Sequence, residues 1–167
     1  MGMDVHGLNP KQNKKIDEFP VYKKIKDIED SGNYNKRHEL LDGDNDLRKK
    51  YYDEWSEYED TNIGTYFRNN CWWWRPLWNF CAEVAPDIIS AELWQSGHSN
   101  DGKGLNDEDA KLLGAYLLTA IKNGTADTFK ENHEIQQKDE EYKYPFDTDI
   151  VKKFAEFCIE SGGFEIC

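Results

Sequence analysis

The chain has 167 residues, which suits one domain able to bury a single core without disulfide or metal staples. Its formal charge of −12, from 33 acidic and 21 basic residues, argues against nucleic acid or anionic lipid as a ligand, because phosphate binding depends on Lys and Arg. An acidic surface serves solubility or attracts a basic partner, and both alternatives stay open. Aromatic residues make up 14% of the chain, so large rings should dominate the core.

The N-terminal sequence "MGMDVHGLNP" lacks the basic and apolar regions of a signal peptide, and no apolar run reaches the length of a membrane span. We therefore expect an unanchored cytoplasmic protein. No pair of cysteines has the two-residue spacing of a zinc knuckle or a redox motif, so all should be reduced and buried. They are Cys71, Cys81, Cys158 and Cys167.

In the first third of the chain, loose alternation over Met3–Leu8 predicts a short strand. The polar residues 11–46 predict a mobile insertion with one short helix near residues 22–29. Apolar residues then recur at intervals of four, four and three, which predicts an amphipathic helix. They are Leu47, Tyr51, Trp55 and Tyr58.

The middle of the chain is divided by proline and glycine. Because Pro76 is best accepted in the first turn of a helix, a helix should begin near residues 75–77, after an extended segment over 66–74. A second helical piece is expected over 88–94. Three glycines within residues 95–105 then predict a loop.

The last third holds the clearest helix signals. Asn106 is a good cap for a helix that ends at Gly124, with buried positions at Leu112, Leu113, Tyr116, Leu117, Ala120 and Ile121. Residues 125–143 form either a charged linker or a solvated helix. Asp147 or Thr148 should cap a final helix, and "FEIC" alternates like a terminal strand that could pair with the first. The fold class predicted is mainly α with a small β-sheet (α+β), as a single domain of four or five helices.

The stretch "FRNNCWWWRPLW" at 67–78 is the first candidate binding region. If its first half is a strand, Trp73 cannot share a face with Trp72 and Trp74. One ring should then lie near the surface beside Arg68 and Arg75, which is typical of a protein hot spot or a platform for a planar ligand. The alternative is ordinary packing, with Trp72 and Trp74 in the core and both arginines paired with acids.

The loop "GHSNDGKG" at 97–104 is the second candidate, because glycines flank His98, Asn100 and Asp101 just before a helix N-terminus. His98 could act as a base or a metal ligand, with Asp101 orienting it or supplying an oxygen. Ordinary turn chemistry explains the same residues equally well.

No phosphate-binding, dinucleotide or metalloprotease motif occurs. Residues 42–53 begin like a calcium loop but depart from it at the sixth and twelfth positions, which excludes an EF-hand and leaves at most a weak surface cation site. No dedicated metal site and no cofactor are predicted.

Four segments together resemble a family of small uncharacterised proteins encoded by tailed bacteriophages and related marine and environmental genomes. They are "MGMDVHGLNP", "GTYFRNNCWWWRPLWNFC" at 64–81, "GHSNDGKGLND" at 97–107 and "YPFDTDIVKKFAEFCIESGGFEIC" at the end. Many members of that family carry a cysteine-rich insertion of zinc-knuckle type before "YPF". This chain has no cysteine there, so no zinc role follows. The resemblance implies a phage accessory protein acting in the bacterial cytoplasm.

Two functions follow as hypotheses. The first is non-enzymatic binding of a host or viral macromolecule through the aromatic and arginine residues of 67–78, with an exposed ring among Trp72, Trp73 and Trp74. The second is a small enzyme or ligand binder whose polar pocket surrounds Arg68, Arg75, His98 and Asp101. The candidate binding residues are Arg68, Asn69, Asn70, Trp73, Arg75, His98, Asn100 and Asp101.

Overall fold

The computed structural model describes residues 2–167, of which 61% are helical and 10% are in strands, so the predicted α+β class is confirmed. Contacts divide the chain into two compact units. Gln12–Asn62 form the insert unit, and the segment ending at Lys11 forms the sheet unit together with Ile63–Cys167.

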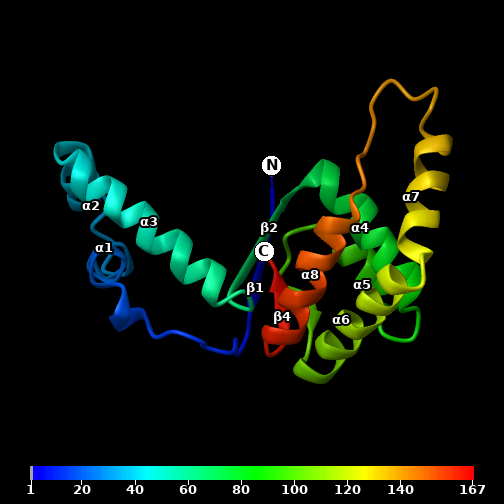
Figure 1. Ribbon diagram of the computed structural model, residues 1–167, viewed down its shortest axis with the longest axis horizontal. Helices are drawn as coiled ribbons and strands as arrows, with labels where there is room; N and C mark the ends of the chain where they lie inside the picture. Colours follow the sequence, from blue (N-terminus) through cyan, green and yellow to red (C-terminus); the bar gives the residue numbers. More distant parts are fainter. Residues whose placement is uncertain (1) are drawn as a thin grey trace. The chain divides into compact units, whose positions relative to one another are not determined.

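Eight α-helices and four strands occur within residues 2–167, where four or five helices were predicted. The helices are α1 (Pro20–Asp30), α2 (Tyr34–Gly43), α3 (Asn45–Thr61), α4 (Cys71–Val84), α5 (Ala91–Ser96), α6 (Asp107–Lys122), α7 (Thr125–Gln136) and α8 (Thr148–Glu160), with a 3-10 turn η1 (Ile16–Glu18). The strands are β1 (Gly2–Gly7), β2 (Tyr66–Asn70), β3 (Gly104–Leu105) and β4 (Phe164–Ile166) (Figure 1).

The insert unit contains more helix than its polar composition suggests. Instead of one helix near residues 22–29, α1 and α2 both form before the predicted amphipathic helix, which is α3. The core of the insert unit consists of Phe19, Tyr22, Ile25, Leu41, Tyr51 and Tyr58. Because α2 buries only Leu41, its sequence shows little apolar periodicity. The compact unit that contains these helices spans Gln12–Asn62, and the mobility of residues 11–46 stays a prediction.

The sheet of the other unit is antiparallel, in the order β2-β1-β4-β3. The expected pairing of the terminal strands is confirmed, since Val5 lies opposite Ile166. The short strand β3 was not expected within the 95–105 loop. At Gly104 an added Cβ would lie 1.8 Å from the carbonyl oxygen of Phe164, so only glycine allows this pairing.

Helices α6 and α8 pack against each other next to the sheet (Figure 1). Both start at the predicted caps: the Asn106 side chain accepts from Asp109 N, and that of Asp147 from Asp149 N. Leu112 departs from the expected buried face of α6, because its side chain is 40% exposed.

The segment 125–143 takes the helical alternative as far as Gln136, and α7 buries only Ala126. All four cysteines are free thiols. Cys81 and Cys158 are buried, and burial raises the pKa of each thiol. Cys71 and Cys167 are only half-buried, contrary to expectation.

Candidate functional site

Helix α4 begins at Cys71, not near residues 75–77 as the proline suggested. The Asn70 side chain caps it, since Oδ1 accepts hydrogen bonds from the backbone amides of Trp72 and Trp73, each at 3.1 Å. Pro76 is therefore the sixth residue of the helix and removes one backbone hydrogen bond. The cap and the buried rings that follow it outweigh the preference of proline for the first turn.

The three consecutive tryptophans therefore lie on a helix and point in three directions about 100° apart. Trp74 is fully buried, stacks on Trp78 with ring centroids 5.4 Å apart, and donates Nε1–H to the carbonyl of Gly97 at 2.7 Å. Trp72 is 43% exposed, and Trp73 is half-buried. The expectation that Trp72 and Trp74 share the core is wrong, because it assumed a strand.

One exposed stripe runs along α4 at intervals of three, four and four residues. It consists of Trp72, Arg75, Asn79 and Glu83. This spacing places the four side chains on a single helix face, one above the other.

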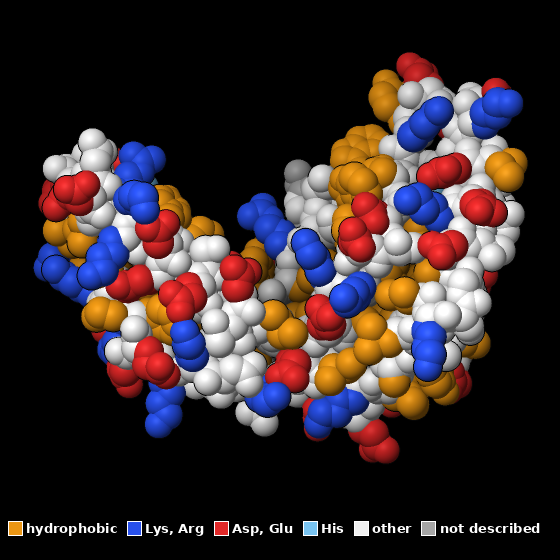
Figure 2. All heavy atoms as spheres, viewed as in Figure 1, with side chains coloured by type: hydrophobic (Ala, Val, Ile, Leu, Met, Phe, Trp, Pro, Cys, Tyr) orange, Lys and Arg blue, Asp and Glu red, His pale blue; other side chains and the backbone are white. Residues whose placement is uncertain are grey.

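An aromatic cluster covers the first turn of this stripe. The Trp72 ring lies 5.1 Å from that of Tyr144 and 6.3 Å from that of Tyr142, which is 65% exposed. Arg75 donates from Nη1 to the Tyr144 hydroxyl at 2.8 Å, and its Cζ lies 5.5 Å from the centre of the same ring. We call Trp72, Arg75, Tyr142 and Tyr144 the Trp72 cluster. Figure 2 shows hydrophobic side chains gathered over the start of α4, below the loop between α7 and α8.

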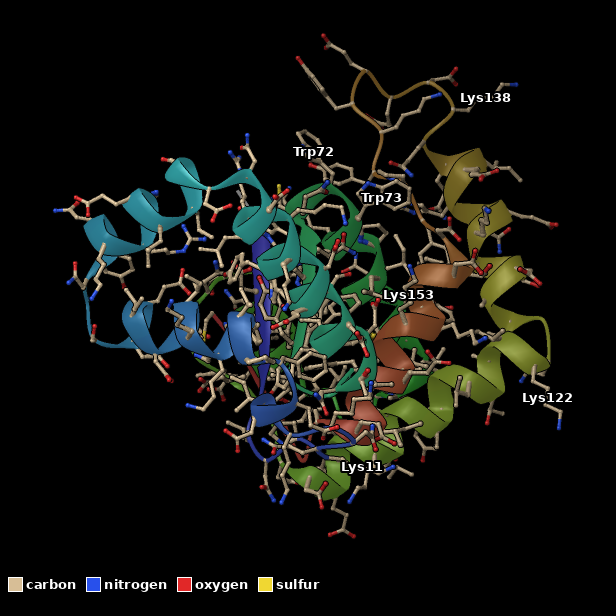
Figure 3. The ribbon with its side chains drawn as sticks, turned by 60° about the vertical axis from the view of Figure 1, so that its left-hand side comes forward. Lys11, Trp72, Trp73, Lys122, Lys138 and Lys153 are labelled. Carbon is tan, nitrogen blue, oxygen red and sulfur yellow. The ribbon has the colours of Figure 1, made fainter. Side chains whose placement is uncertain are left out.

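Contacts from α7 and from Gln137, the residue that follows it, hold Tyr144 in place. Its backbone N–H donates to Gln137 Oε1 at 2.5 Å, and its carbonyl accepts from Gln137 Nε2 at 2.9 Å. His133 Nε2 lies 2.7 Å from the same carbonyl oxygen. Figure 3 shows Trp72 at the start of α4, near the loop between α7 and α8. These contacts hold Tyr144 in position beside Trp72.

A groove begins beside Arg75, Tyr142 and Tyr144 of the Trp72 cluster, follows α4 and α7, and ends between α4 and α6. It consists of three adjoining hollows of about 490, 270 and 300 Å³. The first two share His133 and Gln136, and the last two share Glu83 and Thr125. Pro76 and Phe129 lie along it between the polar side chains of the two helices.

His98 lies near the other side of the same stripe. Its ring meets that of Trp94 edge-on at 5.1 Å, and the Trp94 indole donates to Asn79 Oδ1 at 2.8 Å. Burial, and secondly the charge of Arg75, lower the pKa of His98 below its ordinary value of 6.5. Nδ1 of His98 is buried and has no hydrogen-bond partner among residues 2–167. Arg75 is thus close enough for its charge to act on His98. Both effects favour the neutral form of His98.

The other two candidate residues of the 97–104 loop make contacts that stabilise the loop. Asp101 Oδ1 accepts from Lys103 N at 3.1 Å, which is an ordinary aspartate turn. The Asn100 amide donates to the carbonyl of Gly2 at 3.3 Å. Turn chemistry therefore accounts for Asp101, while Asn100 ties the loop to β1. Among residues 2–167, neither side chain forms a hydrogen bond or an ion pair with His98.

Two candidate residues at β2, Arg68 and Asn70, also make contacts that stabilise the fold. Arg68 Nε lies 3.5 Å from a carboxylate oxygen of Asp4, which also accepts from the Tyr66 hydroxyl. Asn70 is the α4 cap, and Nδ2 of Asn69 is buried without a hydrogen-bond partner among residues 2–167. Of the predicted candidates, Trp73, Arg75 and His98 lie on or beside α4, while Arg68 pairs across the sheet.

Sequence inspection missed Tyr142, Tyr144, Trp94 and Asn79. The charge of residues 125–143 predicts only a linker or a solvated helix. The stretch "YKYPFDTD" indicates renewed order after it, but not that Tyr142 and Tyr144 meet α4. Asn79 and Glu83 would follow from the helical period once α4 is started at the Asn70 cap.

Comparisons with protein-family models, with curated proteins and with solved structures found no match. Over residues 2–167, every helix is too short or too polar to cross a bilayer. In the same range, no three His, Cys, Asp or Glu side chains gather in a way that could hold a metal ion.

Proposed function

We propose that this chain is a non-enzymatic binding protein, of the phage accessory type that its sequence resembles, and that it contacts a host or viral protein through the Trp72 cluster. The observation that carries the proposal is the exposed Trp72 ring held between Tyr142 and Tyr144, with Arg75 over the Tyr144 ring. Trp, Tyr and Arg are the residue types that most often dominate the energy of protein interfaces.

Preorganisation adds weight to this proposal. Tyr144 is fixed by two bonds to Gln137, and Arg75 is already held against its ring, so little side-chain entropy remains to be lost on binding. Trp94 is 39% exposed beside the same helix face and extends the aromatic surface. An exposed group of large rings in an otherwise polar protein is typical of an interaction site.

The alternative of a small enzyme or ligand binder around Arg68, Arg75, His98 and Asp101 gains less support. Asp101 bonds within its own turn and Arg68 pairs with Asp4, so neither is directed toward His98 by a contact. Only Arg75 and His98 interact, and a neutral histidine beside an arginine has no partner to orient it as a base.

Recovery of partners by affinity purification tests the proposal. Tagged wild-type protein and the variants W72A and Y34A would be expressed in bacterial cells, and co-purifying proteins would be quantified by mass spectrometry. Tyr34 is 61% exposed in the insert unit and serves as the matched control for removal of a surface ring. We expect at least one protein to be lost with W72A and kept with Y34A. If no recovered protein depends on Trp72, the proposal is wrong.

A further inference from the structure

The groove between α4 and α7 has one wall without acidic or basic side chains, although α7 carries such residues elsewhere. Its α7 wall carries no Asp, Glu, Lys or Arg, and consists of Thr125, Thr128, Phe129, Asn132, His133 and Gln136. Its α4 wall is the exposed stripe, which ends in Glu83. The acidic side chains of α7, such as Glu131 and Glu134, are not among the lining residues.

The length of the groove suits a short extended chain. From Thr125 to Gln136 the α7 wall rises about 16 Å, at 1.5 Å per residue. An extended chain advances roughly 3.3 Å per residue, so about five residues cover this length.

The α7 wall carries hydrogen-bond donors and acceptors that can pair with a peptide backbone. Each residue of an extended segment presents one N–H and one C=O that require partners when covered. Asn132 and Gln136 both carry a donor and an acceptor, and neither side chain has a hydrogen-bond partner among residues 2–167. These two amides can therefore bond to a main chain irrespective of its sequence.

The charged residues of the groove determine which side chains of a bound peptide would be favoured. Neither Glu83 nor Glu140 forms an ion pair in the described part of the chain, and both line the groove. Arg75 already has Tyr144 as a partner, and eight residues of helix place it about 12 Å from Glu83 along α4. That separation exceeds the Debye length of about 8 Å at physiological salt, so Arg75 repels a cation at Glu83 only weakly.

We propose, resting on the function proposed above, that this groove binds an extended segment of about five residues from the partner protein, with a Lys or Arg side chain against Glu83 and an apolar side chain against the Trp72 cluster. The overall charge of −12 favours the same kind of partner by long-range attraction. Main-chain bonds to Asn132 and Gln136 supply affinity, while Glu83 and the Trp72 cluster supply selectivity.

A displayed library of random heptapeptides, selected on the immobilised full chain, tests this directly. Selected peptides would be synthesised with a fluorescent label, and their affinity for the wild type and for E83Q, E83K, W72A and E134Q would be measured by anisotropy. E134Q removes the same charge from an exposed position outside the groove and is the matched control. We expect enrichment of Lys or Arg, binding weakened about fivefold by E83Q and more by E83K, and no change with E134Q.

Several outcomes would overturn the inference. Enrichment of acidic peptides that depend on Arg75 would mean that the groove selects the opposite charge. Peptides that depend on Trp72 but ignore E83Q would leave the proposed function standing and remove the groove from it. The absence of enrichment, or self-association of the chain that W72A abolishes, would also exclude an extended basic segment. Failure of the proposed function would appear in the separate affinity purification, where W72A and the wild type would then recover the same proteins.

Discussion

Replacement of Trp74 and of Trp72 by alanine should have very different effects on stability, although the two residues are only two positions apart. Trp74 is 0% exposed, while Trp72 is 43% exposed. Removal of a fully buried Trp costs about 3–5 kcal/mol. Loss of the hydrogen bond to the buried carbonyl of Gly97 adds about 1 kcal/mol. W74A should therefore lower the free energy of unfolding by about 4–6 kcal/mol.

W72A removes a ring that is partly in water and touches Tyr142 and Tyr144 at the surface. An exposed aromatic pair contributes about 0.5–1.5 kcal/mol, so the loss should be about 1 kcal/mol. If the segment were a strand, both rings would share one face and the two substitutions would cost the same. A difference of about 3–5 kcal/mol between the losses caused by W74A and W72A would therefore show that α4 is already helical at these two residues.

Urea denaturation followed by intrinsic fluorescence is the assay, because five of the six tryptophans belong to the sheet unit. A protein with a total stability of about 5–15 kcal/mol can be unfolded outright by W74A. W74F is the second variant: it keeps a ring against Trp78 but loses the hydrogen bond, at a cost of about 2–3 kcal/mol. Equal losses for W72A and W74F would refute the assignment of Trp74 to the core and of Trp72 to the surface.

Three further substitutions test single contacts of the same unit. N70A should cost about 1 kcal/mol through loss of the α4 cap, whereas N70D should retain most of it; equal urea midpoints for N70A and the wild type would exclude the cap. G104A should cost about 1–3 kcal/mol, because the new Cβ collides with the carbonyl of Phe164, and circular dichroism melts would detect this; an unchanged melt would mean that β3 does not pair as described. Because the folded chain lowers the pKa of His98 below 6.5, the unfolded chain binds the proton first, and stability should fall as pH drops from about 6.5 to the folded pKa. Urea titrations at several pH values should show a smaller acid-induced loss for H98Q; the same loss in both proteins would contradict the assignment to His98.

Helices α6 and α8 could be predicted from sequence because their caps and their apolar period agree. Asn106 and Asp147 each precede carboxylates in the first turn and an apolar stripe that the fold buries. The start of α4 could not be predicted in the same way, since Asn70 favours a helix at Cys71 while Pro76 favours a later start. Only the burial of Trp74 and Trp78, four residues apart, decides between the two signals.

The candidate site was predictable only in part. Arg75 and an exposed ring beside it were expected from the run of tryptophans, but the ring is Trp72 and not Trp73. Tyr144, which completes the cluster, lies 69 residues after Arg75 in the chain. Nothing in the local pattern of either segment indicates that they meet.

The sequence by itself determined the acidic charge, the α+β class, the capped helices and the pairing potential of the two terminal strands, because these depend on composition and on periodicity within short segments. The tertiary structure alone decided which tryptophan is buried, and it brought Tyr142 and Tyr144 onto the exposed face of α4. The physical reason is that a side chain's exposure and its distant neighbours depend on how the chain returns on itself, and this return is set by the packing of α6, α7 and α8 on the shared core.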